Sequence, residues 1–177
     1  MNTTLAKRQP GSTIKPFTYA LAFDKLGFTP ETTILDFPIA YKTSENYAYE
    51  PKNYTLNYKG EISLRQALSE SVNIPAIKLA EQIGLSSLLE FLRKAGMSSL
   101  REDVDHYGLG LTLGNGETSL YELLQAYTIF TNQGSYCPFQ IFSPLSRSLR
   151  ERETIKDKTI SPLLLGEAHE GSTPGVA

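Results

Sequence analysis

The sequence predicts a mainly helical protein with a few short strands. Five stretches carry apolar residues at helical spacing, and most start at a serine or an early proline and stop at a glycine. The segment between the first two stretches, residues 28–60, contains three prolines and shows no helical periodicity. With 40% hydrophobic and 20% charged residues, the 177-residue chain has the composition of a globular protein.

The first expected helix runs from about Ser12 to Leu26. Pro10 and Gly11 form a turn signal before it, and Pro16 falls in the first turn, where its missing N–H costs nothing. Apolar residues then recur at helical spacing until a glycine follows as a typical stop. The start of this helix carries the first candidate for chemistry.

Ser12 and Lys15 lie three residues apart at this helix start, and so share one face. A serine needs a base to become a nucleophile, and a lysine in an apolar site beside the positive end of a helix has a lowered pKa and can act as one. The N–H of Ser12 could also meet an oxyanion. The alternative is that Ser12 is an N-cap and Lys15 a solvated first-turn residue, and a short S-x-x-K pattern does not decide between these.

Residues 28–60 are expected to form a long loop with short extended pieces at 33–35 and 39–41. A loop of this length in a compact domain is usually functional or held down by its own side chains. Its tyrosines either line a ligand site or anchor the loop on the core, and the sequence favours neither. They are Tyr41, Tyr47, Tyr49, Tyr54 and Tyr58.

Four further helices are expected beyond the loop, each starting at a residue typical of a helix N-terminus. The starts are Ser63, Pro75, Ser86, and Thr118 or Ser119. The glycine-rich stretch 108–116 fits a close-packed loop and not a phosphate-binding loop, because no helix with a lysine follows it in register. Near residues 136–142 we expect at most a short strand.

The composition also excludes several classes of function. The net charge of −2 gives no reason to expect a nucleic-acid partner or an anionic membrane surface. No apolar run approaches the length of about 20 residues that spans a bilayer, and the N-terminus is not a signal peptide. The two histidines and the absence of C-x-x-C or a nucleotide-binding glycine motif predict neither a metal nor a cofactor.

A second motif follows the S-x-x-K of Ser12 and Lys15: Ser71 and Asn73 form S-x-N, and the two motifs together are typical of penicillin-binding proteins and class A β-lactamases. Longer matching stretches surround both motifs, and a third lies further along. They are Arg8–Phe17, Ser63–Ala76 and Leu111–Gly134. Over roughly residues 5–140 the chain resembles the transpeptidase domain of a bifunctional class A penicillin-binding protein, and the subtype resembled most is penicillin-binding protein 1C.

The resemblance implies a role for each motif residue. Ser12 would be the acylated nucleophile and Lys15 the base that accepts its proton. Ser71 would relay the proton to the leaving amine, and Asn73 would bond the substrate amide and Lys15. The alternatives are that Ser71 is a helix cap and that Asn73 is a turn residue.

The resemblance also implies substrates and a location. Members of the family attack the D-alanyl-D-alanine end of a peptidoglycan stem peptide through an acyl-serine, and β-lactam antibiotics acylate the same serine. The parent protein would work on the periplasmic or extracytoplasmic face of the bacterial inner membrane, anchored by a segment outside this chain. A β-lactamase is a nearby alternative, but it needs a base that activates water, and no loop of the expected kind contains such a glutamate.

The chain departs from the family pattern in two ways. The K-T-G motif, which would lie on a strand facing Ser12, is absent, and Lys158-Thr159-Ile160 lacks its glycine. Only 11 residues precede Ser12, so the central-sheet strands are expected to be largely missing. The fold class expected is therefore the helical part of an α/β, serine β-lactamase-like transpeptidase fold.

These departures lead to the remaining expectations. Residues 1–145 would form a partial transpeptidase domain, and residues 146–177 a charged segment with a disordered tail. Without a facing strand, Lys15 is expected to be hydrated and protonated, which leaves little or no turnover. The alternative to an enzyme is a non-catalytic helical remnant or interaction module, which could form a homo-oligomer through exposed apolar surface.

Overall fold

The computed structural model describes residues 3–42 and 48–139. Its helices are η1 (Gly11–Ile14), α1 (Lys15–Leu26), α2 (Leu64–Ser69), α3 (Asn73–Ile83), α4 (Leu85–Lys94), α5 (Val104–Tyr107), η2 (Gly108–Leu113), α6 (Leu120–Tyr127) and η3 (Thr128–Phe130). Its strands are β1 (Lys7–Arg8), β2 (Thr33–Asp36), β3 (Tyr41–Lys42), β4 (Ala48–Tyr49), β5 (Gly60–Ser63) and β6 (Thr118–Ser119). The strands form three separate antiparallel pairs, β1 with β6, β2 with β5 and β3 with β4. The prediction of a mainly helical chain with short strands is confirmed.

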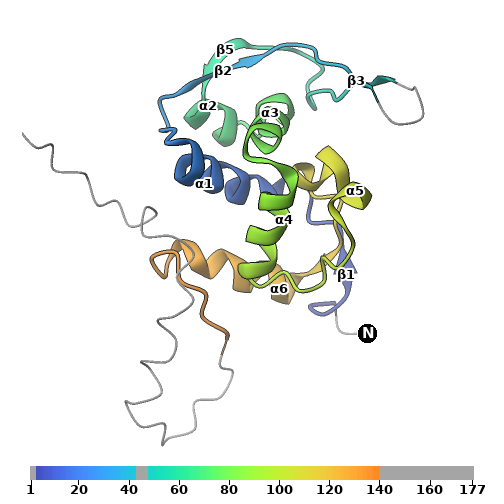
Figure 1. Cartoon of the computed structure of the whole chain (residues 1–177), viewed down its shortest axis with the longest axis vertical. Helices are drawn as coiled ribbons and strands as arrows, with labels where there is room; N and C mark the ends of the chain where they lie inside the picture. The colour runs from blue at the N-terminus through green and yellow to red at the C-terminus, as the bar shows by residue number, and fades with distance from the viewer. Residues whose placement is uncertain (1–2, 43–47, 140–177) are drawn as a thin grey trace, which may run out of the picture.

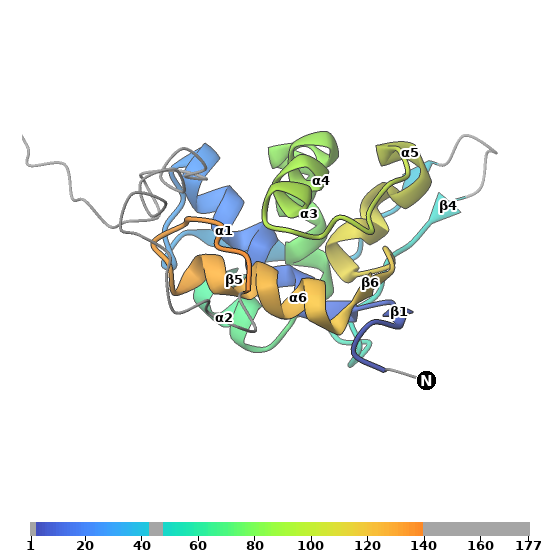
Figure 2. The same cartoon turned by 90° about the horizontal axis from the view of Figure 1, so that it is seen from below.

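Helices α1, α3 and α4 pack together at the centre of the molecule (Figure 1). The β2–β5 ribbon lies across α2 and α3 at one end, and α6 lies with β1 and β6 at the other (Figures 1 and 2). The core contains Phe17 of α1, whose ring packs edge-on against Phe91 of α4 and Tyr127 of α6. The first helix is therefore the element around which the others are arranged.

Local sequence signals account for most helix boundaries. The Ser63 side chain accepts a hydrogen bond from the N–H of Gln66 and caps α2, as its position predicts. Ser119 caps α6 in a reciprocal capping box with Glu122. Ser86, in contrast, is not a cap: α4 starts one residue earlier, with a glycine at the N-cap, so that prediction is wrong.

Other elements were not evident in the sequence. The segment Gly60–Ser63 is a strand that pairs with β2, and residues 108–113 form a short 3₁₀ helix. Residues 136–139 adopt no strand, and residues 140–142, where the expected strand would continue, lie outside the described part of the chain. The charged segment and tail expected at residues 146–177 also lie outside it. Among the described helices, none has the length and apolar character needed to cross a membrane.

Candidate functional site

Ser12 lies in η1, which continues directly into α1, so Ser12 and Lys15 lie on the same helical turn. The Lys15 backbone N–H donates to the carbonyl of Ser12. The N-cap of η1 is Pro10, and Ser12 is exposed. Because the N-cap position belongs to another residue, the alternative reading of Ser12 as a helix cap is wrong.

Contacts from two distant segments fix the position of this turn. The N–H of Gly11 donates to the carbonyl of Gly114 at 3.3 Å, and the Tyr127 hydroxyl donates to the carbonyl of Thr13 at 2.7 Å. Gly114 has φ +80°, and a Cβ added there would lie 2.2 Å from the Gly11 carbonyl oxygen. The glycine-rich stretch is therefore close-packed, as predicted, and it packs against the turn that carries Ser12.

Lys15 is buried, with 1% of its surface exposed. Its ammonium donates to the Ser71 carbonyl at 2.5 Å, to the Ser71 hydroxyl at 3.1 Å and to the Asn73 side-chain oxygen at 2.7 Å. Burial disfavours the charged form and lowers the pKa of Lys15 from 10.5 to about 8. The expectation that Lys15 is hydrated is therefore wrong, and so is the reading of Lys15 as a solvated first-turn residue.

Ser71 lies two residues beyond the end of α2 and has a left-handed conformation, with φ +55°. Its N–H donates to the carbonyl of Leu68, and the N–H of Val72 donates to that of Ala67, which is the Schellman pattern of a helix C-terminus. Glycine is the usual residue at this position, because a Cβ is strained there. The hydroxyl and carbonyl of Ser71 both accept from Lys15, so its backbone N–H belongs to the C-terminal cap of α2 while its side chain bonds the lysine.

Asn73 is the first residue of α3 and is therefore not a turn residue. Its side-chain N–H donates to the carbonyl of Lys52 at 2.8 Å, which leaves its oxygen directed at Lys15. In the described part of the chain the Ser12 hydroxyl makes no hydrogen bond. The structure thus brings three of the four predicted residues into direct contact and places Ser12 one turn from Lys15.

Sequence reasoning missed the contribution of the 28–60 loop to this site. A main-chain carbonyl such as that of Lys52 has no side-chain signature, and Asn53, which is 4% exposed, looks like an ordinary loop residue. Of the tyrosines in this segment, Tyr54 is almost fully exposed and does not anchor it on the core, whereas the Tyr41 hydroxyl donates to Glu81 of α3 at 3.1 Å. Tyr58 helps line a small hollow of about 180 Å³, together with Lys52.

Comparison with known proteins shows the family of the chain. The family model for the penicillin binding protein transpeptidase domain matches residues 2–163. The chain belongs to the penicillin-binding protein transpeptidase family. Penicillin-binding protein 1A of Neisseria meningitidis is 34% identical over 164 residues, covering 92% of this chain and 20% of that protein. Penicillin-binding protein 1A of Clostridium botulinum is 32% identical over 166 residues, covering 88% of this chain and 20% of that protein.

Solved structures show the same fold. Penicillin-binding protein 1A from Haemophilus influenzae matches with a TM-score of 0.69 and 33% identity, over 78% of this chain and 20% of that one. The PonA1 protein from Mycobacterium tuberculosis, in complex with penicillin V, matches with a TM-score of 0.66 and 21% identity, over 78% of this chain and 38% of that one. The described residues thus form the helical part of the transpeptidase fold.

The chain spans about a fifth of the length of the curated relatives it matches. These relatives are of subtype 1A, whereas the expectation from the sequence motifs is subtype 1C. The subtype of this transpeptidase domain stays a prediction.

Proposed function

We propose that this chain carries the acyl-serine machinery of a peptidoglycan D,D-transpeptidase. Ser12 is the nucleophile, Lys15 the base, and Ser71 and Asn73 the groups that pass the proton and hold the substrate amide. The observation that carries the proposal is the buried Lys15 ammonium, bonded to Ser71 and Asn73 one helical turn from Ser12. Such a lysine can act as a base without a histidine.

The reaction starts from the neutral lysine. With a pKa of about 8, Lys15 is neutral in roughly one molecule in ten at pH 7. Its amine takes the proton of the Ser12 hydroxyl as that oxygen attacks the carbonyl carbon of the penultimate D-alanine. The proton then passes through the Ser71 hydroxyl to the amide nitrogen, the C–N bond breaks, and D-alanine leaves. An amine from a neighbouring strand attacks the acyl-serine and regenerates the Ser12 hydroxyl.

The substrates and the location follow from the same family chemistry. The M. tuberculosis relative is described in complex with penicillin V, and a β-lactam would acylate Ser12 here by opening its ring amide. The polymer substrate is the D-alanyl-D-alanine end of a peptidoglycan stem peptide. Because peptidoglycan lies outside the cytoplasmic membrane, the parent protein would act on the extracytoplasmic face of the inner membrane.

We propose that this polypeptide alone turns over slowly. Its 177 residues contain no K-T-G strand to supply the second oxyanion N–H and a cation for the substrate carboxylate. Loss of one oxyanion donor alone costs about 2.7–4 kcal/mol of transition-state stabilisation, or roughly 10²–10³ in rate. A non-catalytic helical module is the second candidate, because apolar side chains such as Leu5, Leu120 and Leu124 are exposed and could support a homo-oligomer.

Mass spectrometry of the intact chain after long incubation with a fluorescent penicillin tests the proposal. We expect a slow single adduct that peptide mapping places on Ser12 and that the Ser12→Ala variant lacks. The matched control is Ser69→Ala, because Ser69 is an exposed serine whose hydroxyl, among the described residues, bonds only to a main-chain carbonyl of its own helix. Absence of any Ser12 adduct would contradict the acyl-serine proposal, and a rate like that of an intact relative would contradict slow turnover.

A further inference from the structure

Helix α3 begins at Asn73 and receives its N-terminal cap from a residue far away in the sequence. Val72, at the N-cap, offers no side-chain hydrogen bond. The side-chain oxygen of Asn53 accepts from the N–H of Asn73 at 3.0 Å and from the N–H of Ile74 at 3.2 Å. Asn53 therefore satisfies two of the donors that a helix start leaves open.

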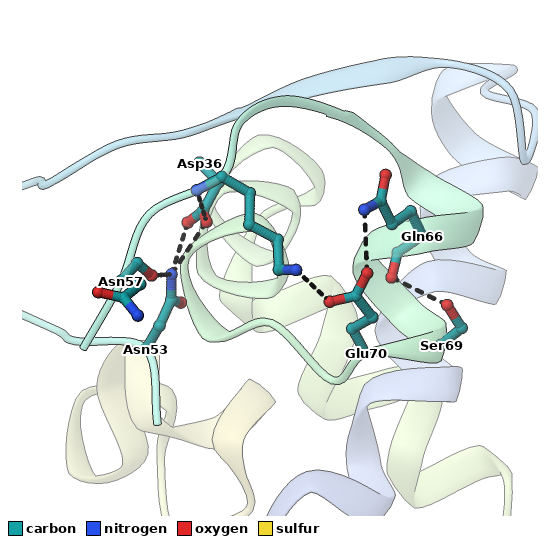
Figure 3. Close-up of polar contacts among 7 residues, drawn as sticks. Asp36, Asn53, Asn57, Gln66, Ser69 and Glu70 are labelled. Carbon is teal, nitrogen blue, oxygen red and sulfur yellow. Dashed lines mark hydrogen bonds and ion pairs between the residues drawn. The ribbon is translucent and has the colours of Figure 1, made fainter. Parts of the chain in front are cut away.

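A buried carboxylate holds the other end of the Asn53 side chain. Both oxygens of Asp36, at 2.8 and 3.0 Å, accept from the Asn53 amide nitrogen, which also donates to the carbonyl of Asn57 at 3.0 Å (Figure 3). Asp36 is fully buried at the end of β2. Because these acceptors take the amide N–H groups, the Asn53 oxygen can only face α3.

The groups that donate hydrogen bonds to the Asp36 carboxylate are uncharged. The backbone N–H of Lys59 donates to Asp36 at 2.9 Å, while the Lys59 ammonium forms an ion pair with Glu70 instead. A buried carboxylate is costly unless donors surround it, and the Asn53 amide and the Lys59 N–H are such donors.

The same loop also sets the side chain of Asn73. Lys52, adjacent to Asn53, accepts the Asn73 side-chain N–H on its carbonyl, so the Asn73 oxygen is left for the Lys15 ammonium. Two consecutive loop residues thus fix the backbone and the side chain of Asn73. A continuous chain of hydrogen bonds runs from Asp36 through Asn53 and Asn73 to Lys15.

We propose that Asn53, oriented by Asp36, is a positioning residue that keeps the Asn73 side chain in contact with Lys15. The inference rests on the proposed acyl-serine chemistry for its consequence, which is the efficiency of Ser12 acylation. Asn53 touches neither Ser12 nor Lys15 directly, and it acts through the start of α3. The 28–60 loop is accordingly part of the machinery that holds the base in place.

The test measures the ionisation of Lys15 in the full chain by NMR, with ¹³C-labelled lysine followed through a pH titration. In Asn53→Ala, the Lys15 ammonium stays buried but loses a fixed acceptor. We therefore expect its midpoint to fall by about one pH unit and the Asn73 side-chain amide signal to move. Above both midpoints, where Lys15 is neutral in both proteins, we expect Ser12 acylation to be about tenfold slower in the variant, because Asn73 no longer holds the amine in place. Asn57→Ala is the matched control, because Asn57 is an exposed asparagine of the same loop that bonds to Asn53 only through its main-chain carbonyl.

A cap with no positioning role gives a different result. Asn73 and Ile74 amides would then exchange faster with solvent in Asn53→Ala, while the Lys15 midpoint and the Asn73 side-chain signal stayed unchanged, and this outcome would overturn the proposal. A rise of the Lys15 midpoint toward that of a free lysine would overturn it as well, since it would mean that water enters the site. If Asn53→Ala does not fold, Asp36→Asn removes one acceptor and should shift the midpoint in the same direction, by less.

The NMR readout does not depend on acylation. If the unmodified chain forms no Ser12 adduct, the proposed function fails while the Lys15 titration still tests the positioning role. If the adduct forms and Asn53→Ala changes neither its rate nor the Lys15 midpoint, only the positioning role fails.

Discussion

Ser71 occupies a position where glycine would be the more stable residue, so its two simplest replacements should differ in stability in an unusual order. A residue with a Cβ in the left-handed conformation costs about 1–2 kcal/mol, and Ser71 has φ +55°. Alanine keeps this strain and removes the hydroxyl, whereas glycine removes both. Comparison of Ser71→Ala with Ser71→Gly therefore separates the backbone strain from the hydroxyl bond.

The two contributions can be estimated from the structure. Ser71→Ala loses the 3.1 Å bond from Lys15, which contributes about 0.5–1.5 kcal/mol net, so we expect about 1 kcal/mol of destabilisation. Ser71→Gly loses the same bond. Relief of the backbone strain stabilises this variant by about 1–2 kcal/mol, and the greater flexibility of glycine in the unfolded chain destabilises it by about 0.5–1 kcal/mol. The glycine variant should then be more stable than the alanine variant, by up to about 1.5 kcal/mol.

Urea unfolding followed by circular dichroism measures these differences, and the adduct assay with penicillin measures the chemistry on the same samples. Both variants should lose Ser12 acylation, because neither has a hydroxyl to pass the proton. Ser69→Ala is the control for removal of a nearby exposed hydroxyl and should stay within about 0.5 kcal/mol of the unmodified chain. An alanine variant more stable than the glycine variant would refute the reasoning, since it would show that the left-handed conformation carries no cost.

Three further predictions concern other parts of the site and its support. Gly114→Ala should lower the free energy of unfolding by about 2–4 kcal/mol in thermal unfolding, because its Cβ would meet backbone atoms at 2.2 Å. Gly27→Ala, with φ +64° and no neighbour within 4 Å, should lower it by only about 1 kcal/mol, and equal losses would contradict the close contact at Gly114. The rate of Ser12 adduct formation should rise with pH and level off above about 8, because only neutral Lys15 accepts the proton, and a flat profile would exclude this base. Burial raises the pKa of Glu122, but hydrogen bonds from neighbouring hydroxyl and N–H groups outweigh it and hold that pKa at about 2 instead of 4.5. In urea titrations the unmodified chain should therefore be more stable than Glu122→Gln by its full margin above pH 4.5, and this margin should decline toward pH 2. A margin independent of pH would contradict this.

The sequence was most informative where structure is decided locally. Ser63 and Ser119 cap their helices through contacts within three residues, and the prolines at the starts of α1 and α3 fit only a first turn. The S-x-x-K spacing likewise places Ser12 and Lys15 on one turn, because the segment is helical. Such features depend on neighbours that the sequence itself specifies.

The missed features all depend on partners far away in the chain. The strand Gly60–Ser63 is too short to show an alternating pattern, and it exists because β2 lies beside it. Asn53 and Asn73 are separated by 20 positions, and no periodicity relates a buried loop asparagine to a helix start. Ser86 failed as a cap because a preceding glycine already begins the helix, a choice that residue preference alone does not settle.

Because Lys15 is buried, slow turnover should have another cause than the hydrated lysine that the sequence predicts. Its ammonium is covered by Ser71 and Asn73, which belong to the helical half itself, so no facing strand is needed to exclude water from the base. What the 177 residues lack is a K-T-G motif, which in our proposal would supply the second oxyanion donor and the cation for the substrate carboxylate, and these act on the transition state and on binding. Acylation of this chain should therefore be slow at every pH, yet keep a midpoint near 8, because a defect in stabilising the oxyanion lowers the rate without altering the ionisation of the base.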